Sequence, residues 1–200
     1  ALRAWQRLHS LDDKAADKGI LVVMNDEIHA AKYVTKTHTT NVATFHTPTH
    51  GPLGIIMKHD ILWFKTAEPR VRFDLKQITG TVPIIKAYAG MGIGDGIISL
   101  LAPEKIDGVV IEALGAGNLP PLAAREIKSL MDKGVPVVLV SRCFNGIAEP
   151  VYAYEGGGVK LQEAGVMFIK ELNAPKARLK LLIALSAGLE GQELKDYIEG

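Results

Sequence analysis

The chain contains 200 residues, which suits one ordinary domain or a small domain joined to part of another. Its 48% of hydrophobic and 22% of charged residues are typical of a folded globular protein and exclude a largely disordered chain. With a formal net charge of +1 and no apolar run long enough to cross a bilayer, we expect no nucleic-acid partner and no membrane partner. The single cysteine, Cys143, excludes an intrachain disulfide and a cysteine-cluster metal site, and it fits oxidising and reducing compartments equally.

The first third of the chain predicts one helix and several short strands. Residues 1–9 have a helix-like pattern, and Gly19 suits the left-handed C-terminal cap of that helix. The threonine-rich residues 34–42 have no helical period and predict a loop, which ends at a proline-bearing turn over 46–52. Short strands, the first of them buried, are expected at 20–24, 53–57 and 61–65.

The pattern changes after a charged segment that contains Pro69. Residues 66–80 predict a linker, and we place the domain boundary there. Beyond it, three β-branched apolar runs are separated by intervals of helix length; they lie at 82–87, 108–114 and 135–141. Because these runs are continuously apolar, they predict strands that are covered on both faces, as in a parallel sheet.

Two segments in this second part predict amphipathic helices. The first begins at Pro120 and Pro121, where a first helical turn tolerates proline, and Gly134 suits its C-terminal end. The second spans 173–188, with small and apolar residues on one face and three solvated cations, Lys176, Arg178 and Lys180. The fold class is therefore α/β, with a small three-layer domain at the C-terminal end.

Lys36 is the first candidate for chemistry, because hydroxyl side chains surround it in a loop just beyond a predicted strand. A lysine amine that is shielded from water and faces hydroxyl groups can lose its proton and serve as a base for a hydroxyl nucleophile. From composition alone, a solvated loop lysine is the commoner alternative.

Asn118 is the second candidate, because it follows a predicted parallel strand within residues 115–121. Ligands of open α/β sheets bind in the crevice outside the carboxyl ends of the strands. Capping of the helix that begins near Pro120 explains the same residue equally well.

Three other features give weaker signals. His46 and His50 are four residues apart, but Pro48 prevents a shared helical face and no further metal ligands are evident. Cys143 follows a strand without an evident base, which favours a buried, inert thiol. Residues 155–158, Glu-Gly-Gly-Gly, permit a close backbone approach or a mobile loop.

Several segments together resemble one family, the bacterial L-asparaginases of the periplasmic type. The segment Val-Thr-Lys-Thr at 34–37 is the most specific, and the others run in the family's order at 19–26, 38–45, 50–54, 115–119, 141–142 and 172–178. The match spans essentially the whole chain. It departs from the family at His50, where a tyrosine is usual, and slightly at Pro175.

The resemblance implies hydrolysis of the side-chain amide of L-asparagine to L-aspartate and ammonia, without a metal or organic cofactor. It implies a threonine nucleophile and an acyl-enzyme, with Lys36 as the catalytic lysine of a proton relay. Asn118 matches the asparagine that one subunit contributes to its neighbour's active site, which implies a homodimer or homotetramer. On this basis residues 1–65 are the C-terminal part of the catalytic N-terminal domain, 66–80 the linker and 81–200 the C-terminal domain.

The sequence also departs from the family where the nucleophile is expected. The strings Thr-Gly-Gly-Thr and His-Gly-Thr-Asp-Thr, which carry the nucleophile and the Thr-Asp pair, do not occur in these residues. We therefore expect a missing N-terminal segment to supply them. A family glutamate from the neighbouring subunit has no direct match, and Glu155 is the nearest choice for substrate binding.

Two alternatives stay open at this point. One is a truncated, non-catalytic relative that binds a small amino acid or serves as an assembly partner. The other is the related amidotransferase subunit, which releases ammonia for tRNA-dependent amidation. Preference for L-asparagine over L-glutamine is also open, because one methylene in a pocket is worth only about 1–3 kcal/mol.

Overall fold

The computed structural model describes residue 15, residues 18–66 and residues 71–200. The helix predicted at 1–9 lies outside these residues. Contacts divide the chain into two units, Ala1–Arg72 and Phe73–Gly200, which we call unit 1 and unit 2. The division falls within the predicted linker. Among the described helices, none has the length and apolar character that crossing a lipid bilayer requires.

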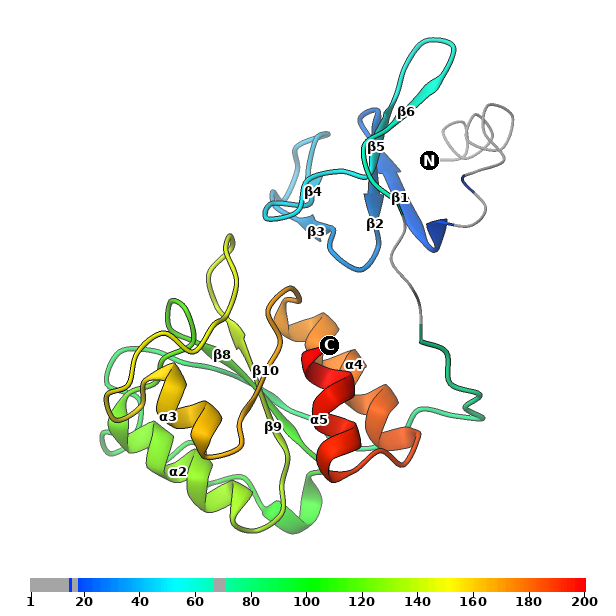
Figure 1. Cartoon of the computed structure of the whole chain (residues 1–200). Coiled ribbons are helices and arrows are strands. Elements are labelled where there is room, and N and C mark those ends of the chain that lie inside the picture. The colour runs from blue at the N-terminus through cyan, green and yellow to red at the C-terminus, as the bar shows by residue number, and fades with distance from the viewer. Residues whose placement is uncertain (1–14, 16–17, 67–70) are drawn as a thin grey trace. The chain divides into compact units, whose positions relative to one another are not determined.

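Unit 1 contains an antiparallel sheet with the strand order β1-β2-β5-β6 (Figure 1). Its strands are β1 (Leu21–Met24), β2 (Glu27–Ala30), β5 (Gly54–Ile56) and β6 (Ile61–Trp63). Between β1 and β2, Asn25 and Asp26 both have positive φ, as a two-residue type I′ hairpin turn requires. The apolar centre of this sheet consists of Ile28, Ile56 and Ile61.

The strands predicted at 20–24, 53–57 and 61–65 are confirmed by β1, β5 and β6. The first was expected to be buried, but all of β1 is half-buried and Ile20 is 80% exposed. Strand β2 was not predicted, although its four residues alternate between polar and apolar side chains.

A short hairpin replaces part of the loop predicted at 34–42. Strand β3 (Thr35–Lys36) pairs with β4 (Phe45–His46) in a separate two-stranded antiparallel sheet. Lys36 therefore lies within a strand and not beyond one. Two residues are too few to show a period of two in the sequence, which explains the difference.

Unit 2 contains a parallel sheet with the strand order β10-β9-β8-β7. Its strands are β7 (Ile84–Lys86), β8 (Val109–Ala113), β9 (Val137–Ser141) and β10 (Met167–Phe168). The first three confirm the predicted apolar strands and their parallel arrangement. β10 was not predicted, because it consists of only two residues.

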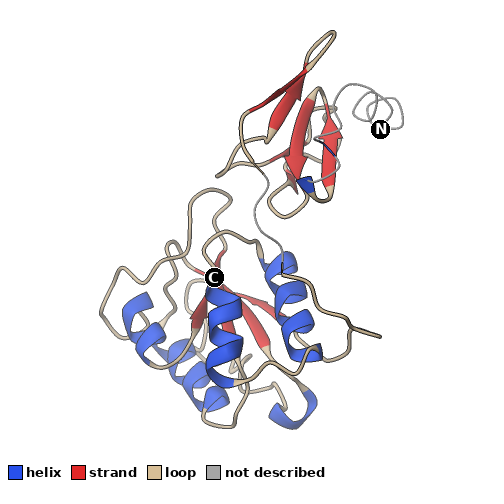
Figure 2. Cartoon of the chain, turned by 45° about the vertical axis from the view of Figure 1, so that its right-hand side comes forward, coloured by secondary structure: helices blue, strands red, loops and turns tan. Residues whose placement is uncertain are grey.

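Helices cover both faces of the parallel sheet (Figures 1 and 2). One face carries α2 (Pro121–Met131) and α3 (Gly158–Glu163), and the other carries α4 (Ala174–Ser186) and α5 (Gly191–Glu199). A single turn of 3-10 helix, η2 (Pro103–Lys105), precedes β8. The predicted three-layer α/β arrangement is confirmed.

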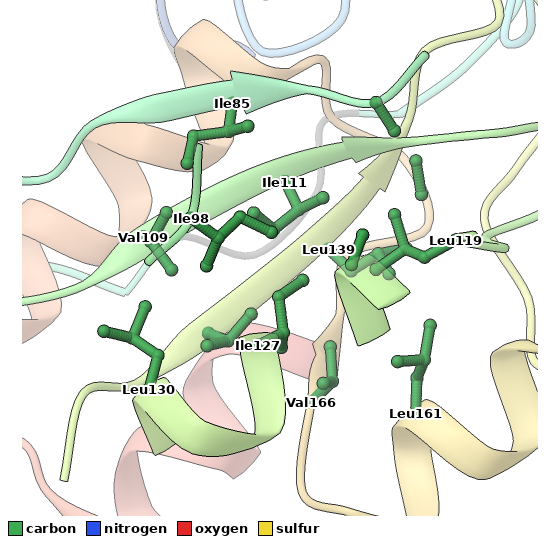
Figure 3. Close-up of a cluster of buried hydrophobic side chains, with 14 of the residues drawn as sticks. Ile85, Ile98, Val109, Ile111, Leu119, Ile127, Leu130, Leu139, Leu161 and Val166 are labelled. Carbon is green, nitrogen blue, oxygen red and sulfur yellow. The ribbon is translucent and has the colours of Figure 1, made fainter. Parts of the chain in front are cut away.

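Alternate residues of each central strand point to opposite faces of the sheet. Val109 and Ile111 pack with α2, whereas Val110 packs with α4. Figure 3 shows the cluster on the α2 side, in which Ile111, Leu139 and Ile127 are fully or nearly fully buried. The two clusters explain why these strands are continuously apolar.

The two predicted helices are confirmed by α2 and α4, and Gly134 ends the first with positive φ. The three cations of α4 are half-buried, however, and not solvated. Arg178 Nε donates to the carbonyl of Val82 (2.7 Å), Lys180 Nζ donates to that of Ile198 (2.9 Å), and burial lowers the pKa of Lys176. Helix α5, which was not predicted, supplies Ile198.

The C-terminal part of the predicted linker packs on unit 2. The ring of Phe73 contacts Tyr197 of α5, with centroids 5.2 Å apart. Further along, the amide of Thr79 donates to Oγ of Ser186 at 3.0 Å. Residues 73–80 are thus attached to α4 and α5 by side-chain contacts.

Candidate functional site

The β3–β4 hairpin places Lys36 opposite Phe45, and Thr35 opposite His46. The side chain of Lys36 is exposed. The hydroxyl of its neighbour Thr37 donates to the carbonyl of Thr44 (3.0 Å), so this hydroxyl supports the hairpin.

Polar side chains close the tip of this hairpin. Nδ1 of His38 accepts hydrogen bonds from the amides of Thr40 (3.1 Å) and Asn41 (3.0 Å). Oδ1 of Asn41 accepts from the amide of Ala43, and Oγ1 of Thr44 accepts from the amide of His38. The polar side chains of this segment therefore stabilise its backbone conformation, in addition to any catalytic role.

Asn118 lies at the carboxyl end of β8, as predicted. The chain turns back there, since Leu114 and Asn118 exchange two backbone hydrogen bonds of 2.9 Å. Oδ1 of Asn118 accepts a hydrogen bond from the amide of Gly158 (3.2 Å), the first residue of α3. The capping alternative was wrong about the helix, because Pro120 is the N-cap of α2 and no side chain caps that helix.

Glu155 lies in the loop that precedes α3, and both its carboxylate oxygens contact one guanidinium. Arg125 of α2 donates from Nε to Oε1 (2.6 Å) and from Nη2 to Oε2 (3.1 Å). This hydrogen-bonded arginine holds the pKa of Glu155 below its ordinary value. Sequence patterns gave no indication of Arg125, because 30 residues separate it from Glu155.

The loops of Asn118 and Glu155 lie side by side in unit 2. The amide of Leu119 donates to the carbonyl of Gly156 (2.8 Å), and a Cβ on Gly156 would lie 2.2 Å from the carbonyl oxygen of Leu119. The predicted close backbone approach at 155–158 is thereby confirmed. Two of the three predicted site residues are thus brought together, and Lys36 belongs to unit 1.

Polar groups also connect the carboxyl ends of three parallel strands. Oγ of Ser141 donates to the carbonyl of Gly115 (2.6 Å), and Nη1 of Arg142 donates to that of Ala87 (2.9 Å). These bonds fix the strand ends from which the Asn118 loop departs.

One of the weaker sequence features has other surroundings than expected. Cys143 is exposed and not buried, because it follows β9 in a surface turn. His50 stacks on Tyr33 with ring centroids 4.2 Å apart. Within the described part of the chain, His, Cys, Asp and Glu side chains form no group of three or more that could hold a metal ion.

Two family models match the chain. The glutaminase/asparaginase C-terminal domain matches residues 81–198, and the N-terminal asparaginase domain matches residues 8–69.

Curated relatives agree with these models. A probable L-asparaginase of Deinococcus radiodurans is 40% identical over 190 residues, which cover 93% of this chain and 57% of that protein. L-asparaginase 2 of Escherichia coli is 29% identical over 188 residues, covering 92% of this chain and 53% of the relative. The chain thus spans a little more than half the length of these two relatives.

A solved structure agrees with the fold. The crystal structure of a probable cytoplasmic L-asparaginase from Campylobacter jejuni superposes with a TM-score of 0.76 at 26% identity, covering 94% of this chain and 57% of that one. With the model of the C-terminal domain matching more than half of its residues, the chain belongs to the glutaminase/asparaginase family.

Proposed function

We propose that this chain is part of an L-asparaginase, which hydrolyses L-asparagine to L-aspartate and ammonia. The observation that carries the proposal is the family match along both units, together with the segment Val-Thr-Lys-Thr at 34–37. The relatives named above are described as L-asparaginases, which supports asparagine as the substrate.

Lys36 is the proton-handling residue of this proposal. A threonine hydroxyl attacks the side-chain carbonyl of asparagine, and its proton passes through the relay that contains the Lys36 amine. Collapse of the tetrahedral intermediate releases ammonia and leaves an acyl-enzyme, which water then hydrolyses to aspartate. The position of Lys36 in a short hairpin with an internally bonded tip supports this role, because the hairpin fixes the backbone from which the exposed side chain of Lys36 reaches the relay.

The attacking threonine comes from polypeptide outside these 200 residues. Neither sequence string that carries the nucleophile or the Thr-Asp pair in this family occurs here. We propose that the complete enzyme joins this chain to that segment.

Asn118 and Glu155 serve substrate binding from a neighbouring copy in a homodimer or homotetramer. Their loops are joined by the Leu119–Gly156 hydrogen bond, which supports a common role. Asn118 contributes its side-chain amide, and Glu155 contributes a carboxylate that is paired with Arg125.

Lys36→Met tests the proposal in the complete enzyme. Ammonia release from L-asparagine and L-glutamine is measured after mass spectrometry has defined every polypeptide in the sample. We expect the variant to keep its thermal midpoint and to lose most turnover, because methionine preserves an unbranched side chain that reaches to Cε but has no amine. Lys58→Met is the matched control, since Lys58 lies in an exposed turn between β5 and β6.

Wild-type turnover in Lys36→Met would remove Lys36 from the relay. Full activity of a 21.6 kDa polypeptide with no companion segment would overturn the proposed source of the nucleophile. Binding of L-aspartate without any turnover by the complete protein would favour the non-catalytic alternative.

A further inference from the structure

A polar cluster connects strand β2 with strand β4 in unit 1. Nδ1 of His29 lies 3.0 Å from Oγ1 of Thr47, and its Nε2 lies 3.3 Å from Oε2 of Glu27. The same carboxylate oxygen lies 3.5 Å from Nδ1 of His46. His29 is fully buried and Thr47 is 5% exposed, whereas the side chains of Glu27 and His46 are 33% and 43% exposed, so the cluster extends from the interior to the surface.

One protonation state suits the contacts of His29. Burial lowers the pKa of its imidazole despite the opposing effect of Glu27, so the ring is neutral at physiological pH. Its Nε2–H then faces the Glu27 carboxylate, and its Nδ1 accepts from the Thr47 hydroxyl. The approach of Nε2 to Glu27 is not an aligned hydrogen bond, which leaves the bond to Thr47 as the directional contact.

This cluster joins two separate sheets. β2 belongs to the four-stranded sheet, whereas β4 belongs to the hairpin that carries Lys36. His46 is the register partner of Thr35, the residue before Lys36, and Thr47 follows directly. The orientation of the hairpin on the sheet is therefore coupled to the side chains of Glu27, His29 and Thr47.

We propose that Glu27, His29 and Thr47 are positioning residues, which hold the β3–β4 hairpin on β2 and thereby fix the backbone from which the Lys36 side chain extends. This inference rests on the proposed catalytic role of Lys36. Burying a polar group costs free energy unless the group is hydrogen-bonded. Apolar side chains in the same space would therefore cost no more to bury than these polar ones. What the polar cluster adds is the directional hydrogen bond between His29 and Thr47.

The double variant His29→Leu/Thr47→Val separates positioning from stability. Replacing both partners of a buried hydrogen bond by apolar groups of similar shape can be nearly neutral for stability. The hairpin would then lose its directional contact while unit 1 stays folded. Thr47→Val alone, compared with Thr47→Ser, which restores a hydroxyl, keeps the test decisive if the double variant does not fold.

Two readouts are measured in the complete enzyme. For L-asparagine, we expect kcat to fall by about tenfold to a hundredfold with KM little changed, as for a misplaced catalytic group. We expect faster amide hydrogen exchange at the paired residues of β3 and β4, with unchanged exchange in the β1–β2 ladder. Thr66→Val, the same change at an exposed threonine of unit 1, should alter neither.

Wild-type kcat in the double variant, or unchanged exchange in the hairpin, would overturn the positioning role. The proposed catalytic role of Lys36 is tested separately. Full turnover in Lys36→Met would refute the proposed function, whereas loss of turnover there together with a fully active double variant would refute only the positioning role. A lower kcat in Thr47→Val that Thr47→Ser does not restore would also contradict it.

Discussion

The fully buried imidazole of His29 couples the stability of unit 1 to pH. Burial lowers its pKa from the ordinary value of 6.5, so the unfolded chain binds a proton more readily than the folded unit. The free energy of unfolding is therefore greatest above pH 6.5 and falls as the pH drops from there to the lowered pKa of the folded state.

Urea unfolding of wild type and His29→Leu on both sides of pH 6.5 measures this effect. We expect the wild-type protein to lose more stability than the variant on acidification, because leucine removes the titrating group. Equal losses in the two proteins would assign the pH dependence to other residues.

At Asn118, the structural role and the proposed functional role can be separated by one substitution. Oδ1 accepts the hydrogen bond from Gly158, and aspartate preserves an acceptor oxygen there while removing the Nδ2 donor. We expect Asn118→Asp to keep the thermal midpoint of unit 2 and to reduce turnover, whereas Asn118→Ala should also cost about 1 kcal/mol of stability. Retained activity in Asn118→Asp would show that the amide donor is not required.

Among the elements, the glycine segment before α3 is the most sensitive to added volume. Gly156 has a φ of +84°, and a Cβ there would lie 2.2 Å from the carbonyl oxygen of Leu119. Gly188 has a similar φ of +78° with nothing within 4 Å. The two glycines thus share a left-handed backbone conformation and differ in their surroundings.

We expect Gly156→Ala to destabilise unit 2 more than Gly188→Ala, by roughly 1–3 kcal/mol, because the backbone of the Asn118 loop must move. Chemical denaturation of the two variants provides the measurement. Equal destabilisation would mean that positive φ alone explains the need for glycine at 156.

The elements that could be predicted from the sequence are those whose structure is determined by their own residues and not by distant partners. β8 and β9 are continuously apolar because both faces are covered, and α2 carries proline at its start and Gly134 at its end. The short strands β3 and β10 depend on their partner strands. α5 has only two buried residues, Leu194 and Ile198, so its packing against α4 is a tertiary effect.

The site could be predicted only in part, for the same reason. Lys36 and Asn118 are candidates that local sequence suggests, but their surroundings come from distant residues. Gly158 lies 40 residues from Asn118, Arg125 lies 30 from Glu155, and Thr47 lies 18 from His29. Side-chain partners at such separations leave no local pattern.

At the scale of the whole chain, the buried apolar residues are unequally divided. Unit 2 contains two large clusters on opposite faces of its sheet, whereas the described part of unit 1 contains a cluster of three buried isoleucines. Residues 73–200 therefore contain a hydrophobic core of their own.

We expect a fragment of residues 73–200 to unfold cooperatively, because all residues of its two clusters lie within it. Calorimetry tests this: a single transition with matching calorimetric and van't Hoff enthalpies is expected. A fragment without a transition would mean that unit 2 depends on unit 1 for its stability.

The contact between Phe73 and Tyr197 brings the point where the chain enters unit 2 beside the helix with which it ends. Domains whose two ends are neighbours tolerate circular permutation and insertion into other proteins. Residues 73–200 are therefore suited to circular permutation: a short linker can join residue 200 to residue 73, and new ends can be opened in the surface turn after β9. Such a permuted protein would present the Asn118 loop on an independent scaffold.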